Sequence, residues 1–167
     1  MLPNNDLRRT SSEGNCIMEM PRLVITGVDQ DNHSKIEADG PISSYKDYPQ
    51  FEGLRISDIW KATALPASLE VPTTLNTHTV GPNVNADLKG FNVRYIVFPP
   101  KSTYALHTTP TIDFTVVISG QIVITLDDGE VRLNAGDILI QRSTHHGWSN
   151  PTDQPCGVLL FIVGADH

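Results

Sequence analysis

The chain has little of what would place it in a membrane, on nucleic acid or in an oxidising compartment. Its two cysteines, Cys16 and Cys156, lie too far apart in the 167 residues to form a metal or redox motif. Lys and Arg number 12 against 19 Asp and Glu, a formal net charge of −7, which argues against a nucleic-acid partner. No apolar run approaches the ~20 residues that span a bilayer, and the N-terminus has no apolar signal core. We therefore expect two free thiols and a soluble, cytoplasmic protein without a membrane partner.

Amphipathic helices are also missing, and short runs of alternating apolar residues replace them. Residues 1–20 are polar and without periodicity, so we expect a disordered arm followed by one domain over residues 21–167. A long connection over residues 64–90 is expected to cover one end of that domain. Strands are expected over residues 21–26, 35–37, 54–63, 91–98, 104–109, 113–119, 121–126, 130–133, 138–141 and 157–163.

Turn signals stand between these short strands. Asp128-Gly129 separates two alternating runs and predicts a tight hairpin, and Gly120 and Asn150-Pro151 mark two further turns. Short strands at even spacing indicate an all-β fold, either an antiparallel barrel or a jelly roll.

Two polar clusters accompany these strands, the second in the segment between the strands expected at 138–141 and 157–163. The first holds His107, Thr109 and Asp113, and the second holds His146 and Trp148. The members of each cluster are separated by even numbers of residues, so along a strand they share one face. If both sets point inward, two imidazoles, a carboxylate, a hydroxyl and an indole meet inside the barrel.

These side chains allow two kinds of chemistry. Imidazole and carboxylate together are the ligand set for Zn, Fe, Mn or Ni, and two His with one carboxylate suit non-haem Fe(II). The same groups without metal act as acid and base near neutral pH. The cofactor expectation is therefore either none or one divalent metal.

The two clusters resemble the two motifs of the cupin family over about residues 91–163. His107, Thr109, Asp113 and Gly120 stand where the first motif has His-x-His, then Glu, then Gly. Gly129, Ala135-Gly136-Asp137, His146 and Asn150 match the second motif, with Ala135 in place of the usual proline. The resemblance implies an antiparallel double-stranded β-helix, or jelly-roll barrel, and a protein that commonly forms a homodimer.

The resemblance also implies four metal ligands, which fall on His107, Thr109, Asp113 and His146. Thr109 replaces an imidazole with a neutral hydroxyl, which binds these metals far more weakly. His107, Asp113 and His146 remain as the metal set, or as catalytic residues without a metal. The substitution shifts the expectation from a committed metal oxygenase toward an acid–base site.

Three functions stay open. The first is a non-redox enzyme on a small molecule (dehydratase or other lyase, isomerase, decarboxylase or cyclase), which the resemblance associates with specialised metabolism. The second is an Fe(II)-type dioxygenase, and the third is a non-catalytic small-molecule-binding cupin. The candidates for contacting the small molecule are Arg94, which suits a carboxylate or enolate, with Tyr104, Thr109, Gln141 and Trp148.

Overall fold

A computed structural model describes residues 8–10, 16–18, 20–42, 45–48, 51–68 and 89–166. Over these residues the chain consists of strands and their connections, with no helix. It divides into two compact units, Met1–Ser44 and Tyr45–His167. The absence of helices in the described ranges agrees with the all-β fold predicted from the sequence.

The first unit contains two separate antiparallel pairs. β1 (Arg8–Thr10) pairs with β2 (Cys16–Met18), and β3 (Arg22–Val28) pairs with β4 (Ser34–Pro41). The latter pair is fastened near its open end, where the Arg22 guanidinium donates two hydrogen bonds of 2.6 Å to the Asp39 carboxylate.

The boundary between the units differs from the predicted one. The sequence placed residues 1–20 in a disordered arm and residues 21–44 in the barrel domain. Instead, short strands lie within the arm, and β3 and β4 form ladders only with each other. Because no ladder joins them to the later strands, residues 21–44 group with the first unit.

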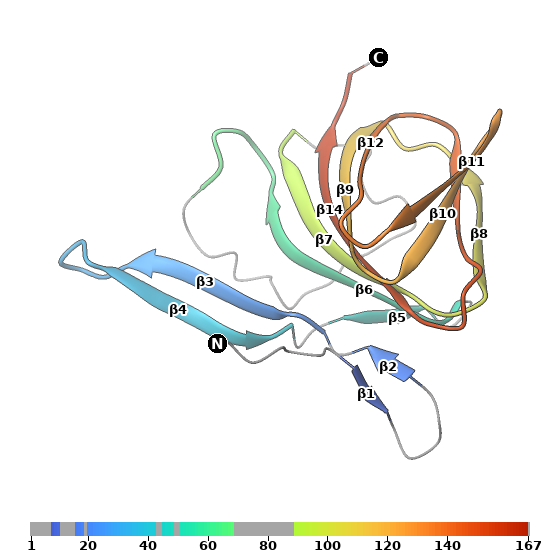
Figure 1. Ribbon diagram of the computed structural model, residues 1–167. Helices are drawn as coiled ribbons and strands as arrows, with labels where there is room; N and C mark the ends of the chain where they lie inside the picture. The colour runs from blue at the N-terminus through green and yellow to red at the C-terminus, as the bar shows by residue number, and fades with distance from the viewer. Residues whose placement is uncertain are drawn as a thin grey trace. The chain divides into compact units, whose positions relative to one another are not determined.

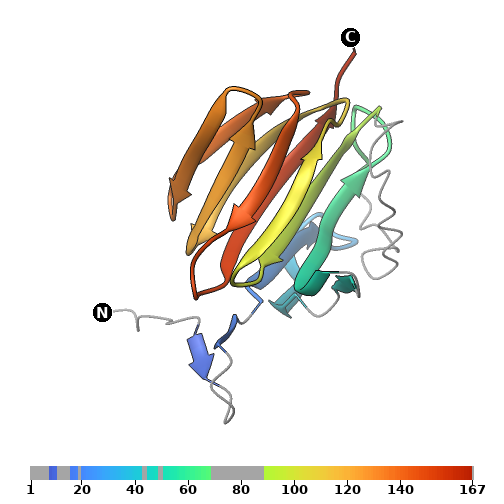
Figure 2. The same cartoon turned by 90° about the vertical axis from the view of Figure 1, so that its right-hand side faces the viewer.

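The second unit consists of two antiparallel sheets that face each other, as Figures 1 and 2 show. One sheet has the order β12-β9-β14-β7-β6-β5 and the other the order β11-β10-β13-β8. The strands are β5 (Lys46–Tyr48), β6 (Phe51–Ala62), β7 (Phe91–Phe98), β8 (Ser102–His107), β9 (Thr111–Ser119), β10 (Gln121–Leu126), β11 (Gly129–Asn134), β12 (Ile138–Arg142), β13 (His146–Asn150) and β14 (Cys156–Gly164).

The core lies between these sheets. Ile122 and Ile124 of β10, Val117 of β9 and Val158 of β14 are almost completely buried there. They occupy alternate positions, which is why each strand is apolar on one face. Cys156 is a buried free thiol, as expected, whereas the side chain of Cys16 lies outside the described part of the chain.

The predicted strands from residue 91 onward agree with the structure to within about two residues at either end. Residues 40–53, where no strand was expected, hold the end of β4, β5 and the start of β6. Strand β13, with the sequence HGWSN, was not among the expected strands because it has no β-branched residue. Most of the 64–90 connection, residues 69–88, lies outside the described residues.

Gly120 makes the tight turn from β9 to β10. Its φ is +77°, and a Cβ there would lie 2.6 Å from the carbonyl oxygen of Pro155. Both the left-handed backbone and the close approach require glycine. The next hairpin closes at Asp127-Asp128, where Leu126 pairs with Gly129, as the sequence predicted.

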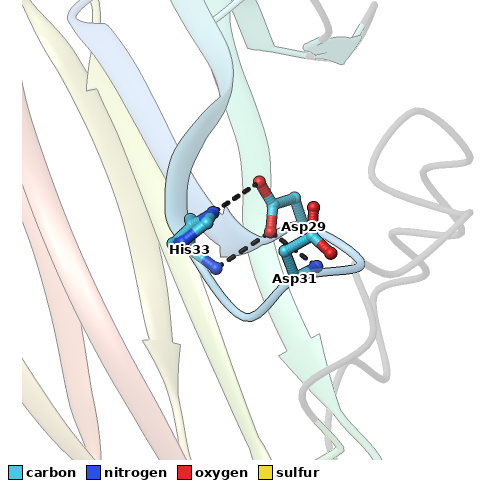
Figure 3. Close-up of side chains that lie close together, drawn as sticks. All are labelled: Asp29, Asp31 and His33. Carbon is cyan, nitrogen blue, oxygen red and sulfur yellow. Dashed lines mark hydrogen bonds and ion pairs between the residues drawn. The ribbon is translucent and has the colours of Figure 1, made fainter.

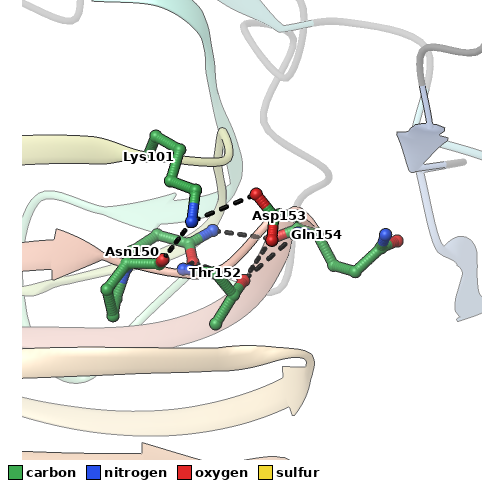
Figure 4. Close-up of polar contacts among 6 residues, drawn as sticks. Lys101, Asn150, Thr152, Asp153 and Gln154 are labelled. Atoms are coloured by element: carbon green, nitrogen blue, oxygen red, sulfur yellow. Dashed lines mark hydrogen bonds and ion pairs between the residues drawn. The ribbon is translucent and has the colours of Figure 1, made fainter.

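Asn150 organises the turn that leads from β13 into β14 (Figure 4). Its Nδ2 donates to the carbonyl oxygens of Phe98 and Gln154, at 3.3 and 2.8 Å. Its Oδ1 accepts from the backbone N–H and the hydroxyl of Thr152, at 3.1 and 2.7 Å. The side chain is fully buried and uses its amide as a structural clamp. This motif residue therefore has a structural role, fixing the turn between β13 and β14.

Candidate functional site

Two imidazoles from neighbouring strands meet at one end of the four-stranded sheet. His146 begins β13 and pairs in register with His107, the last residue of β8. Their ring centroids lie 4.3 Å apart, with the rings inclined by 50°. His146 is buried, whereas His107 is exposed. The sequence placed both rings in the interior, and the structure differs for His107 because β8 ends there.

An irregularity in the ladder lets β8 present more than one side chain to this site. His107 faces His146, but the next pairing is Tyr104 with Trp148, so two residues of β8 stand opposite Gly147 alone. A β-bulge of this kind changes the alternation of faces. Gly147 is required there, because a Cβ would lie 2.8 Å from the Tyr104 carbonyl oxygen. Tyr104 and His107, three residues apart, can thus both face His146 and its neighbours.

The backbone fixes which nitrogen of each imidazole carries the proton. Nδ1 of His107 lies 3.0 Å from the carbonyl oxygen of Ala105, and Nδ1 of His146 lies 2.9 Å from that of Thr144. A carbonyl only accepts, so each Nδ1 carries the hydrogen and each neutral ring keeps a lone pair on Nε2. Both Nε2 atoms are therefore able to accept a proton.

Gln141 braces the buried imidazole. Its side-chain amide lies 2.7 Å from His146 Nδ1, and Gln141 itself is buried on β12. Because that Nδ1 donates to Thr144, the amide atom facing it must be the oxygen, which turns the NH₂ group away from the ring. Gln141 also pairs in register with Asp113 of β9, so it stands between the imidazole and the carboxyl group.

Asp113 is a buried carboxyl group whose Oδ1 has no hydrogen-bond partner within the described residues. Burial raises its pKa, and a hydrogen bond from Thr111 and the charges of Arg94 and His107 oppose that shift. The hydroxyl oxygens of Thr111 and Thr109 are hydrogen-bonded at 2.9 Å. Thr109 lies in the β8–β9 connection, so its hydroxyl reaches Asp113 only through Thr111.

Burial shifts the pKa of His146 in the other direction. Desolvation lowers it, the hydrogen bond to the Thr144 backbone raises it, and the charges of His107 and His145 lower it further. His146 thus stays neutral, and Asp113 keeps its proton to higher pH than an ordinary aspartic acid. Burial thus favours the uncharged form of both groups, and shifted pKa values of this kind are common where side chains act as acid and base.

A buried ion pair lies on the same inner face as Asp113. Arg94 of β7 donates from Nε to Asp58 Oδ1 at 2.7 Å, and Asn92 donates from Nδ2 to the same oxygen at 2.9 Å. Sequence reasoning identified Arg94 as a candidate but not Asp58. An acidic residue within a strand of apolar residues was the signal that could have pointed to it.

The two aromatic candidates pack against the core. Trp148 is buried, with its ring centroid 6.0 Å from those of Phe98 and His146. Tyr104 makes an edge contact with Phe98 at 5.3 Å, and burial raises its pKa while a hydrogen bond with Ser102 lowers it. These rings form the apolar wall beside His146. The adjacent His145 points to the surface and pairs with Asp127 at 2.7 Å.

The predicted metal ligands are of suitable chemical types, but their ligand atoms do not lie within 4.8 Å of one another. Two Nε2 lone pairs and the unpartnered Asp113 Oδ1 are proper donors for Zn or Fe. However, among the described residues the only three such groups with ligand atoms within 4.8 Å of one another are Asp29, Asp31 and His33 (Figure 3). Those three lie exposed in the β3–β4 turn and hydrogen-bond among themselves. The residues at the barrel site therefore do not fit a three-ligand metal centre as they stand.

The two facing antiparallel sheets form a β-barrel. Its inner strands carry imidazole, carboxyl and guanidinium groups, which together make a polar site. The Cupin_2 family model, described as a cupin domain, matches residues 94–163. The cupin domain of Cnp3 from Schizosaccharomyces pombe shares the fold, with a TM-score of 0.54 and 10% identity over 86% of this chain and 87% of that one. Residues 94–163 therefore form a cupin domain, as the two motifs indicated.

Curated relatives match the same part of the chain. Oryzines biosynthesis cluster protein J of Aspergillus oryzae is 39% identical over 75 residues, 44% of this chain and 42% of the relative. The cupin-domain-containing oxidoreductase fogC of Aspergillus ruber is 39% identical over 77 residues, 44% of this chain and 38% of the relative. The matched segment thus spans about two fifths of each relative. No helix in the described residues is long and apolar enough to cross a membrane.

Proposed function

We propose that this cupin is a non-redox enzyme of specialised metabolism that transfers protons on a small organic substrate. The observation that carries the proposal is a buried, neutral His146 that contacts Gln141, which in turn pairs in register with Asp113, a carboxyl group whose pKa is raised. The chemistry is that of a dehydratase or other lyase, an isomerase, a decarboxylase or a cyclase. The biosynthesis-cluster relatives support the metabolic setting.

The reaction needs no group beyond the chain's own residues. His146 Nε2 removes a proton from a carbon next to a carbonyl group, and the electron pair of that C–H bond moves to the carbonyl oxygen. Asp113 gives its proton to that oxygen, which yields an enol. Reprotonation at another carbon gives an isomer, and expulsion of a β-hydroxyl group as water gives a dehydrated product. His107, at the exposed side of the pair, exchanges the proton with solvent.

Proton transfer at carbon can be tested before the natural substrate is identified. Acetylacetone, pyruvate and phenylpyruvate would be incubated in D₂O with the protein, and deuterium uptake at the carbon next to the carbonyl followed by NMR. We expect accelerated exchange of at least one compound, and a fall of about 10²-fold or more in His146→Ala, because a positioned base contributes that much. Chelator should leave the rate unchanged.

His145→Ala is the matched control for this experiment. It removes the adjacent imidazole, which pairs with Asp127 at the surface, and should keep the wild-type exchange rate. Background exchange for every compound, or equal rates in wild type and His146→Ala, would contradict the proposal.

A metal-dependent oxidase or dioxygenase is the second candidate, and the oxidoreductase relative favours it. It requires His107, Asp113 and His146 to close around one ion, which their present separation does not provide. Metal analysis after purification without chelator, together with oxygen uptake after addition of Fe(II), separates the two functions. Stoichiometric iron with oxygen consumption would support this candidate, whereas absence of both would eliminate it.

A further inference from the structure

We propose that Arg94, oriented by Asp58, binds a carboxylate group of the substrate, so that the substrate is a small organic acid. The inference rests on the proposed function, because it places the acid's reactive carbon near His146. It adds a substrate class and gives Asp58 a positioning role that no motif assigns.

The guanidinium of Arg94 is buried and only partly satisfied. The Arg94 side chain is 7% exposed and that of Asp58 is 19% exposed. Asp58 holds the guanidinium through Nε, while Nη2 is buried without a hydrogen-bond partner in the described part of the chain. A guanidinium in a protein does not lose its proton, so its unused N–H groups need an acceptor other than the described residues, which a bound ligand would supply.

The strand registers place further unsatisfied groups around Nη2. Leu160 of β14 pairs with both Arg94 and Thr115, so these three residues form one row across the sheet. Ile162 pairs in the same way with Asn92 and Asp113 and forms the next row. Residues that face each other across a ladder share a face, and Leu160 and Ile162 belong to the core between the sheets. The whole group therefore lies on the inner face.

Each of these rows contains buried polar atoms that lack a partner among the described residues. They are Arg94 Nη2 and Thr115 Oγ1 in one row, and Asn92 Oδ1 and Asp113 Oδ1 in the other. Isolated orphan atoms of this kind are rare in native proteins, and a cluster of them indicates a site for a polar ligand.

The charge and shape of this group favour a carboxylate. Arg94 is the cation of the cluster. Its planar guanidinium can donate two parallel hydrogen bonds to the two oxygens of a carboxylate, a geometry that a lysine ammonium group does not offer. Asp58 pairs with the guanidinium through Nε and leaves Nη2 without a hydrogen-bond partner among the described residues. Asp113 lies near enough to Arg94 to feel its charge, yet makes no hydrogen bond with it that would occupy Nη2.

The test uses simple acids and their uncharged counterparts. Binding of benzoate, pyruvate and phenylpyruvate would be compared with that of benzamide and pyruvamide by NMR titration of the whole chain. We expect at least one acid to bind at least 10-fold more tightly than its amide, and to shift the Arg94 Nε–H resonance in the wild-type protein. Equal affinity for acid and amide, or no binding by any of the three acids, would overturn the inference.

Three variants separate the roles of the residues. Arg94→Lys keeps the charge but loses the planar N–H pair, and should weaken acid binding at least 10-fold. Asp58→Asn should weaken acid binding while leaving amide binding unchanged, a difference that a merely structural role would not produce. Unchanged acid binding in a folded Arg94→Lys protein would overturn the inference. The wild-type resonance shift remains decisive if the variant does not fold.

His146→Ala keeps this test independent of the proposed function. It should lose deuterium exchange and still bind the acid within about 2-fold of wild type. Exchange without acid selectivity would leave the proposed function standing and refute the role of Arg94. Selective acid binding without deuterium exchange would support the role of Arg94 and contradict the proposed function.

Discussion

At the scale of single residues, the site depends on what the backbone does to each imidazole. His107 and His146 are each held through Nδ1 by a carbonyl two residues earlier in the chain. A histidine in solution exchanges freely between its two tautomers, whereas these two are fixed with Nε2 as the acceptor. The protein thus prepares two bases in a defined orientation without any charged partner in direct contact with either ring.

The lowered pKa of His146 predicts a pH dependence of stability. In the unfolded chain this group titrates near pH 6.5, so below that pH the unfolded state binds more protons than the folded state. The contribution of His146 to stability is therefore fully present above pH 6.5 and is lost as the pH falls toward the lower folded pKa. The loss approaches about 1.4 kcal/mol per pH unit in that window.

His146→Gln is the reference that isolates this effect, because glutamine does not titrate. Melting temperatures of both proteins at pH 7.5 and pH 5.0 measure it. Wild type should lose more stability than the variant on acidification. The raised pKa of Asp113 acts in the opposite sense, above about pH 3.8, but it is common to both proteins and cancels in the comparison. Identical losses would show that His146 titrates as an exposed histidine.

Individual site residues were predicted from the sequence to different degrees. The spacing of the two motifs identified His107, Asp113 and His146, and the strand position of Arg94 made it a candidate. The bulge opposite Gly147 and the partnership of Asp58 with Arg94 were not predicted. Both depend on the register between strands distant in sequence, which side-chain alternation within one strand does not determine.

At the scale of elements, the short strand β13 contributes residues to the site, to the core and to the following turn. It supplies His146 to the site, Trp148 to the core and Asn150 to the following turn. Its residues have weak strand propensity, so its conformation comes from its neighbours β10 and β8 and from the clamp at Asn150. This is the reason the sequence showed its side-chain alternation but not a strand.

The Asn150 clamp predicts a measurable loss of stability. Asn150→Ala removes four hydrogen bonds and leaves the buried carbonyl oxygen of Phe98 with one partner fewer. We expect the free energy of unfolding to fall by about 2–4 kcal/mol, since buried groups that lose their partners each cost roughly 1–3 kcal/mol. Urea denaturation measures it.

Thr125→Ala provides the control for that measurement. It removes a hydrogen bond of 3.1 Å between two exposed side chains, Thr125 and Glu130, and should cost less than about 1 kcal/mol. A similar loss in both variants would mean that the Asn150 network adds nothing beyond a surface contact.

At the scale of the whole molecule, the outer face of the six-stranded sheet carries exposed apolar side chains. Ile140, Phe114 and Phe161 form one row across β12, β9 and β14, and Ile138 lies beside it. They are 55%, 42%, 38% and 69% exposed. Together they present roughly 400 Å² of apolar surface, about the largest patch that a monomer usually shows and half of one partner's share in a standard interface.

We predict that a second copy of this chain covers that face in a homodimer. An apolar patch on a sheet face can pack against its own copy about a two-fold axis. Light scattering coupled to gel filtration should give twice the mass of the chain. Ile140→Lys, by placing a charge in the interface, should give the monomer mass.

Val131→Lys is the matched control, because Val131 is also half exposed but lies on β11 of the other sheet. It should leave the dimer intact. A monomer in the wild-type protein, or dissociation caused equally by both substitutions, would contradict the predicted interface.

The bulge between β8 and β13 makes the site sensitive to the number of residues as well as to their kinds. Ala105 and Leu106 together stand opposite Gly147 and act as a spacer of fixed length between Tyr104 and His107. Deleting either one would remove the bulge and leave a single residue opposite Gly147, although every residue of both motifs would still be present. Because the bulge sets how β8 presents its side chains to the site, changes in the length of this segment are expected to be less well tolerated than changes of side chain at its exposed positions.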